Sequence, residues 1–148
     1  MRKTVIFLTA LLGVFLIDQG VKELFLNGFE WHSKCISLEL HLNKGVAFSM
    51  LSFLGENLKW LQLLLVGFLV YLVYSEGWFQ KYPLSLGLLA GGALGNLYDR
   101  FANGAVTDFV YWHCGFDFAV FNFADVMIDV GIAFILLQEF LAWKRAKQ

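Results

Sequence analysis

The polar side chains that could do chemistry are concentrated in residues 95–125, where one apolar segment ends and another begins. Asn96, Asp99 and Arg100 have the helical spacing i, i+3 and i+4, and Asn122 and Asp125 have the spacing i and i+3. The members of each group are therefore expected to share one helix face. A further aspartate lies between them in the alternating segment VTDFV. In chain order, the side chains are Asn96, Asp99 and Arg100, then Asp108, then Asn122 and Asp125.

Two carboxylates from different elements could form a water-activating pair. Two close carboxylates cannot both ionise, so one keeps a proton while the other acts as a base on a shared water. Aspartic peptide hydrolysis requires such a pair. It also requires groups that hold the substrate and stabilise the oxyanion, for which Arg100 and the asparagine amides are candidates. Spacing alone does not decide whether Asp99 or Asp108 is the partner of Asp125.

The composition is that of a membrane protein. The chain has 148 residues, of which 59% are hydrophobic and 16% charged, whereas soluble domains average about 45–50% apolar and about 25% charged residues. The length suits one domain, residues 1–148. No basic run or basic–aromatic patch suggests a nucleic-acid partner.

Apolar runs predict a bundle of four transmembrane helices with a small extracytoplasmic β element. The first run has a basic start like a signal peptide, but no A-x-A cleavage site follows, so we expect a retained helix. The segment ISLELHLN alternates apolar and polar residues, which predicts a strand with one apolar face lying on the membrane surface. The predicted spans are 3–26, 57–75, 83–101 and 120–143, with the β element at about 32–56.

Basic residues at both chain ends predict that both termini are cytoplasmic. All the distinctive polar residues then fall at the outer face of the membrane. Asp18 and Lys22 also lie at this level, near the end of the first span, and their i, i+4 spacing allows an ion pair. That pair is either a snorkelling interfacial pair or a support for a site. Asp99 beside Arg100 is interpreted as a structural or substrate-positioning pair.

The remaining reactive side chains have plainer interpretations. Cys35 and Cys114 are interpreted as two unrelated thiols, although a disulfide stays open because both lie on the same predicted side of the membrane. Asp117 is interpreted as a solvated loop residue. His32, His41 and His113 lack metal-ligand spacing and are expected to be ordinary loop or strand residues, so we expect no metal and no cofactor.

Three functions compete at this point. The first is the peptidase. The second is a small proton- or ion-coupled transporter subunit, in which intramembrane carboxylates form a relay at several depths. Asp129 and Glu139 lie deeper in the last helix, but the other acidic groups cluster at one interface, which favours an enzyme. The third is a metal-dependent membrane hydrolase, disfavoured by the lack of paired histidines near the site.

Five short motifs carry a resemblance to a known family. They are DQGVK at 18–22, NKGVAF at 43–48, GGALGNLYDR at 91–100, VTDF at 106–109 and FNFAD at 121–125. With these motifs in this order, the chain resembles the lipoprotein signal peptidase family, also called type II signal peptidase. These are aspartic peptidases of the bacterial cytoplasmic (inner) membrane. The resemblance covers nearly the whole chain, including its length and four-span plan.

The resemblance implies that Asp108 and Asp125 are the catalytic dyad. It implies substrate or inhibitor contacts for Asn43 and Arg100. It also implies that the strand region is a β-cradle on the outer leaflet, and that the substrates are prolipoproteins whose cysteine carries diacylglycerol, cut just before that cysteine. Membrane lipid would surround the protein, which we expect to be a monomer. Supporting roles are implied for Asp18, Lys22, Asn96, Asp99 and Asn122. Asp129 departs from the family pattern by adding a carboxylate one turn from the dyad.

Overall fold

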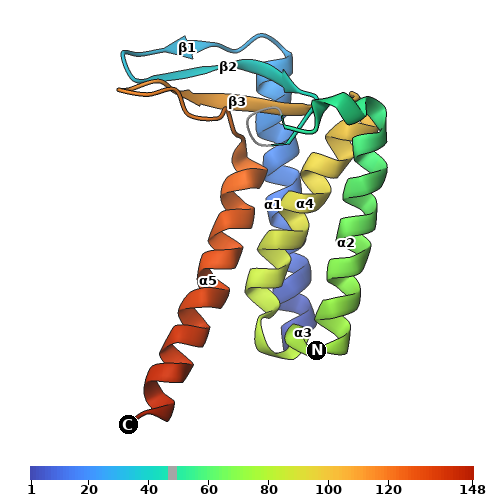
Figure 1. The fold of residues 1–148 in the computed structure, drawn as a ribbon, viewed down its shortest axis with the longest axis vertical. Helices are drawn as coiled ribbons and strands as arrows, with labels where there is room; N and C mark the ends of the chain where they lie inside the picture. The colour runs from blue at the N-terminus through green and yellow to red at the C-terminus, as the bar shows by residue number, and fades with distance from the viewer. Residues whose placement is uncertain (47–49) are drawn as a thin grey trace.

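The computed structural model describes residues 1–46 and 50–148. Long helices stand side by side beneath a small sheet, and both termini lie at the end of the molecule away from that sheet (Figure 1). The elements in chain order are α1 (Arg2–Leu26), β1 (Trp31–His32), β2 (Ile36–Asn43), η2 (Ser52–Asn57), α2 (Leu58–Ser75), α3 (Trp78–Lys81), α4 (Pro83–Ala102), β3 (Val106–Trp112) and α5 (Phe123–Ala146).

Within the described residues, three helical segments are long and apolar enough to cross a membrane: Arg2–Leu26, Ser52–Ser75 and Phe123–Ala146. The helix α4 is not among them, although it has 20 residues. Its sequence contains several glycines and ends in a cluster of polar side chains, both of which lower its hydropathy. The four-span plan therefore stays a prediction.

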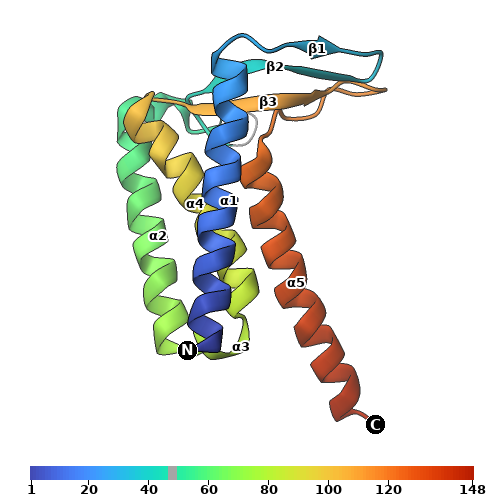
Figure 2. The same ribbon diagram turned by 180° about the vertical axis from the view of Figure 1, so that it is seen from behind.

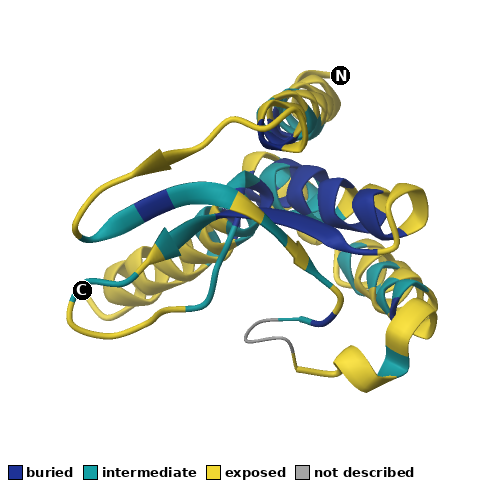
Figure 3. Cartoon of the chain, turned by 90° about the horizontal axis from the view of Figure 1, so that it is seen from above, coloured by how far each residue is buried: buried dark blue, intermediate teal, exposed yellow. Residues whose placement is uncertain are grey.

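Glycines of α4 allow the other helices to approach it closely. Gly87 and Gly91 face α1, and Gly92 and Gly95 face the start of α5 and Asp18 of α1. This surface of small residues thus receives two helices. Figure 2 shows α1 lying across α4. Burial is greatest in the middle of the molecule, while the outer helix surfaces are exposed (Figure 3).

The sheet is antiparallel, with strand order β1-β2-β3. The alternating segment forms β2, as predicted. The sheet extends beyond the predicted β element, because β3, which follows α4, pairs with β2. In that pairing His41 lies opposite Asp108 and Asn43 lies opposite Val106. The register thereby brings the side chains of Asn43 and Asp108 close together.

Cys35 and Cys114 form a disulfide, so the interpretation as unrelated thiols is wrong. The strand register explains the pairing. Ile36 lies opposite Trp112 at the end of the β2–β3 ladder, and the amide of His113 donates to the carbonyl of Cys35 at 2.9 Å. The chain segments that leave the sheet here are therefore held side by side, each with a cysteine at or next to this contact.

We predict that Gly91→Val destabilises the protein, because a Cβ at this position would lie 2.7 Å from the Leu11 carbonyl oxygen and 2.8 Å from the Val14 Cβ. Overpacking of this kind costs about 1–3 kcal/mol, so the midpoint of thermal unfolding in detergent should fall by about 5 °C. Gly67→Val is the matched control, since nothing lies within 4 Å of a Cβ there. Equal midpoints for the two variants would contradict the close α1–α4 packing.

Candidate active site

A buried ammonium group, that of Lys22, lies among the polar side chains that the sequence singled out. The Nζ atom of Lys22 lies 2.8 Å from Asp18 Oδ2 and 2.9 Å from Asp99 Oδ2, and it donates to Asn96 Oδ1 at 2.9 Å. Its three donors are thus all used. Lys22 is 1% exposed and Asp18 is 0% exposed, so the interpretation of this pair as a snorkelling pair at the interface is wrong.

The two carboxylates of these ion pairs also accept hydrogen bonds from the backbone of two other elements. Asp18 Oδ1 accepts from the amide of Ala124 in the first turn of α5 at 2.9 Å. Asp99 Oδ2 accepts from the amide of Thr107 in β3 at 3.0 Å. Ala124 directly precedes Asp125, and Thr107 directly precedes Asp108. The buried charges therefore position both aspartates through the backbone.

Asp99 is paired with Lys22, which corrects the expected pairing with Arg100. Asp99 and Arg100 point to different sides of α4, so the single helix face expected for Asn96, Asp99 and Arg100 is wrong for these two residues. Asp99 faces α1, where the Gln19 amide also donates to it at 3.1 Å. Arg100 instead faces the segment that follows β2.

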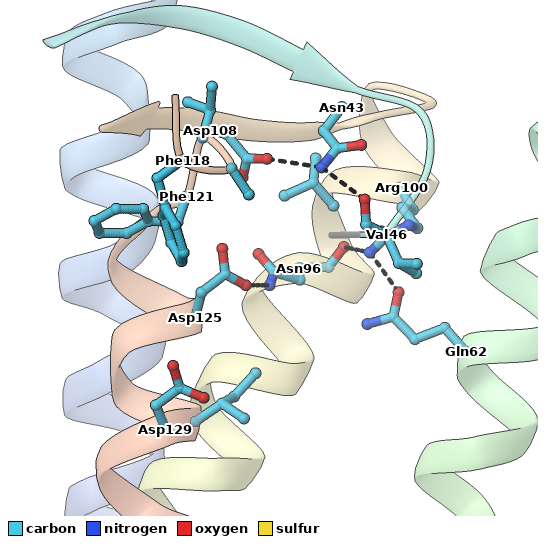
Figure 4. Close-up of a pocket in the computed structure, with 14 residues that line it drawn as sticks. Asn43, Val46, Gln62, Asn96, Arg100, Asp108, Phe118, Phe121, Asp125 and Asp129 are labelled. Atoms are coloured by element: carbon cyan, nitrogen blue, oxygen red, sulfur yellow. Dashed lines mark hydrogen bonds between the residues drawn. The ribbon is translucent and has the colours of Figure 1, made fainter. Parts of the chain in front are cut away.

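Asparagine amides hold the carboxylates of Asp108 and Asp125 (Figure 4). Asp108 Oδ1 accepts from Asn122 Nδ2 at 2.7 Å, and Asp108 Oδ2 accepts from Asn43 Nδ2 at 2.9 Å. Asp125 Oδ1 accepts from Asn96 Nδ2 at 2.8 Å. Asp125 and Asn122 also form a capping box at the start of α5, which is a common way to satisfy the first free amides of a helix. Each carboxylate is thus oriented by neutral donors.

The pKa of Asp108 is raised to about 6, mainly by burial and also by the nearby charge of Asp125, which together outweigh the opposite effects of the hydrogen bonds from Asn43 and Asn122 and of the charge of Lys22. An unfolded aspartate has a pKa of about 3.9. Asp108 therefore keeps a proton more readily than an ordinary aspartate, as a shared-proton pair requires.

Both aspartates line one pocket of about 390 Å³. The polar lining of this pocket includes Asn43, Asn96 and Arg100. Its apolar lining includes residues 118–121 and Ile128. A mostly apolar concavity with a few convergent polar groups is typical of a site for a small or extended ligand.

The guanidinium of Arg100 joins three parts of the chain around this pocket. It donates to the carbonyl of Gly45 at 2.6 Å and to Gln62 Oε1 of α2 at 2.7 Å. Gln62 was missed by sequence reasoning, although it is the only amide side chain in the run WLQLLLVGFLVYLVY. That isolated polarity is the signal that could have identified it. Ala47 and Phe48, the end of the NKGVAF motif, lie outside the described residues.

The other singled-out residues lie elsewhere, with one exception. Asp117 is exposed and accepts from the hydroxyl of Tyr111 at 2.7 Å. His41 contacts Glu39 and His113 contacts Ser37 on the sheet. In residues 1–46 and 50–148, no group of three or more His, Cys, Asp or Glu side chains is arranged to hold a metal ion. The exception is Asp129, which lines the pocket.

The chain is similar to known proteins over nearly its whole length. Residues 10–141 match the sequence model of a family described as signal peptidase (SPase) II. The lipoprotein signal peptidase of Sulfurovum sp. (strain NBC37-1) is 57% identical over 137 residues, which cover 93% of this chain and 94% of that protein. The lipoprotein signal peptidase of Helicobacter pylori (strain P12) is 45% identical over 140 residues, covering 94% and 89%.

A solved structure, described as a bacterial membrane enzyme, shares the fold with a TM-score of 0.78. The two chains are 25% identical, and the match covers 96% of this chain and 91% of the other. The arrangement of apolar helices beneath a small antiparallel sheet is therefore the fold of a known membrane enzyme.

We predict that Lys22→Met strongly destabilises the protein, because it leaves Asp18 and Asp99 buried without a countercharge. Breaking a buried ion pair in this way costs about 3–5 kcal/mol, so the thermal midpoint in detergent should fall by about 10 °C. The triple variant Asp18→Asn, Lys22→Met and Asp99→Asn should recover much of this loss. Lys59→Met is the control, since Lys59 lies 3.9 Å from the exposed Glu56 and such surface pairs contribute little. A small effect of Lys22→Met would contradict the role of the buried ammonium.

We predict that the Asp108 carboxyl makes stability fall as the pH rises from about 4 to 6. In this window the folded protein keeps a proton that the unfolded chain has released, so its stabilising effect is complete below the unfolded pKa and is lost as the pH passes the folded value of about 6. The loss is up to about 3 kcal/mol. Asp108→Asn removes the titration, so thermal midpoints of the wild type relative to this variant should decline by about 5–10 °C between pH 4 and 7. Asp117→Asn should leave the slope unchanged, and a constant difference for Asp108→Asn would contradict the raised pKa.

Proposed function

The chain belongs to the signal peptidase II family, and from this membership we propose that it cuts prolipoproteins with Asp108 and Asp125 as its catalytic dyad. Its activity is that of the family, the removal of signal peptides from lipoprotein precursors. The cut falls just before a cysteine that already carries diacylglycerol. The observation that supports the dyad is that two carboxylates from different elements, β3 and α5, line one pocket.

The proposed reaction uses the one proton that the pair shares. The ionised carboxylate takes a proton from a water, and that water attacks the carbonyl carbon of the scissile peptide bond. The protonated carboxyl donates to the carbonyl oxygen, which gives a tetrahedral intermediate. Proton transfer to the nitrogen then releases the new amino terminus, as the carbon–nitrogen bond breaks. The asparagine amides orient the two carboxylates and do not compete with them for the proton, because an amide does not titrate in this range.

Arg100 and Asn43 are proposed to contact the substrate. Arg100 lines the pocket and is 9% exposed, and its Nε has no hydrogen-bond partner among the described residues. A buried donor without a partner is costly, and a substrate carbonyl oxygen would satisfy it. Asn43 donates to Asp108 and stands at the rim of the same pocket. The proposed supporting residues are Asp18, Lys22, Asn96, Asp99 and Asn122.

We place the protein in the bacterial inner membrane with α4 as a fourth span. A helix of 20 residues is about 30 Å long, which matches the hydrocarbon thickness. Both termini lie away from the sheet (Figure 1), and Lys144 and Arg145 lie in the last turn of α5, so the termini are placed in the cytoplasm. The sheet and the dyad then lie at the outer face. One chain supplies all the proposed site residues, which supports a monomer.

The transporter alternative is not favoured. A relay needs acidic groups that are free to exchange protons at several depths. Glu139, the deepest acidic residue of α5, instead lies 2.5 Å from Lys81 and accepts from the hydroxyl of Tyr82. It therefore joins the end of α5 to α3 and the start of α4.

We predict that Asp108→Asn and Asp125→Asn each lower the cleavage rate of a synthetic diacylated prolipoprotein peptide by at least about 10³-fold. The reason is that neither an acid nor a base remains at the replaced position. Cleavage is measured by mass spectrometry in detergent, with folding checked by the thermal midpoint. Asp117→Asn should cleave normally. Near-normal cleavage by either dyad variant would overturn its assignment, and inhibition of the wild type by a chelator would favour a metal-dependent hydrolase instead.

A further inference from the structure

Asp129 is a carboxylate that the proposed mechanism does not use. It lines the same pocket as Asp108 and Asp125 and is exposed. Among the described residues it has no hydrogen-bond or ion-pair partner. The helix around it is one of the three apolar segments. An ionisable side chain in such a helix is costly and is kept for a function more often than by chance, so an unpartnered one that faces a pocket points to a ligand.

The position of Asp129 relative to the dyad indicates which part of a ligand it would meet. Asp125 and Asp129 are spaced i, i+4 and share one face of α5. Figure 4 shows Asp129 one turn farther from the sheet than Asp125. One helical turn rises about 5.4 Å, and an extended peptide advances about 3.3 Å per residue. Asp129 therefore lies beside a point about one or two residues along an extended peptide from the bond held at the dyad.

The backbone of a bound signal peptide needs a hydrogen-bond acceptor near this position. A peptide bond within a helix is inaccessible to a dyad, so the segment next to the scissile bond must be extended when it is cut. Its backbone amides then lose their helical partners within an apolar environment, where unpaired amides are strongly unfavourable. In the proposed topology the signal peptide comes from the cytoplasmic side, so the residues before the scissile bond lie on the Asp129 side of the dyad.

We propose that Asp129 is a substrate-binding residue that accepts a hydrogen bond from a backbone amide one or two residues before the scissile bond. This inference rests on the proposed function and adds to it a binding position for the signal-peptide backbone. Because the contact is to backbone, it holds the extended segment in register without selecting a particular side chain. It also supplies a hydrogen-bond acceptor next to Ile128 on α5, one turn farther from the sheet than Asp125.

The test compares Asp129→Leu and Asp129→Asn with the wild type on two kinds of diacylated peptide. One kind has ordinary amides, and in the other an ester oxygen replaces one backbone N–H at each of the two positions before the scissile bond in turn. In the wild type, one of the esters should lower kcat/KM by about tenfold, mainly through KM, because a hydrogen bond to a charged acceptor is lost. Asp129→Leu should lose about tenfold on the amide peptide, and the same ester should cause no further loss. Asp129→Asn keeps an acceptor oxygen and should lose about threefold.

The outcomes separate this inference from its premise. Glu76→Leu, which removes an exposed carboxylate from the α2–α3 connection, should behave like the wild type on every peptide. A full ester penalty that persists in Asp129→Leu would overturn the contact, as would unchanged kinetics of that variant. Equal shifts of the pH profile in Asp129→Leu and Asp129→Asn, without the ester coupling, would show that the charge acts on the dyad and would also overturn it. Failure of the wild type to cleave the amide peptide would overturn the proposed function itself.

Discussion

The ammonium group of Lys22 is the charge on which the rest of the structure depends. Its two carboxylate partners, Asp18 and Asp99, each also accept a hydrogen bond from a backbone amide. One of these amides begins α5 and the other begins the part of β3 that carries Asp108. Helix packing alone would allow small sliding and rotation between these elements. A buried ion pair tolerates little of either, because any gap leaves a charge uncompensated in a medium of low dielectric constant.

The layer above this ion pair is built from amides instead of charges. Asn43, Asn96 and Asn122 donate to the two pocket carboxylates. A lysine or arginine at these positions would lower the carboxylate pKa and drive off the proton that an acid–base pair needs. Neutral donors orient the carboxylates while burial keeps the pKa of Asp108 high. Charged side chains thus align the helices and β3 around Lys22, whereas neutral amides hold Asp108 and Asp125.

Periodic features of the sequence predicted the periodic parts of the fold. Apolar runs predicted the long helices, and alternation predicted β2. Helical spacing also grouped Asn96 with Asp99 and Asn122 with Asp125. What spacing could not predict depends on contacts between distant segments. The partner of Asp99 is 77 positions away in α1, and β3 joins the sheet by pairing with β2, from which η2, α2, α3 and α4 separate it in the chain. Gln62 gave a weak signal, since one amide in an apolar run indicates a polar contact without naming Arg100 as its partner.

The bond between Cys35 and Cys114 has a topological consequence. These residues are 79 positions apart, so β2, α2, α3, α4 and β3 all belong to a single closed covalent ring. The helix α1 with β1 on one side, and α5 on the other, lie outside it as two arms that leave the ring at its cysteines. A single backbone break inside the ring would leave both arms attached to one molecule. The arm that carries Asp125 and the ring that carries Asp108 would then stay together even in a nicked chain.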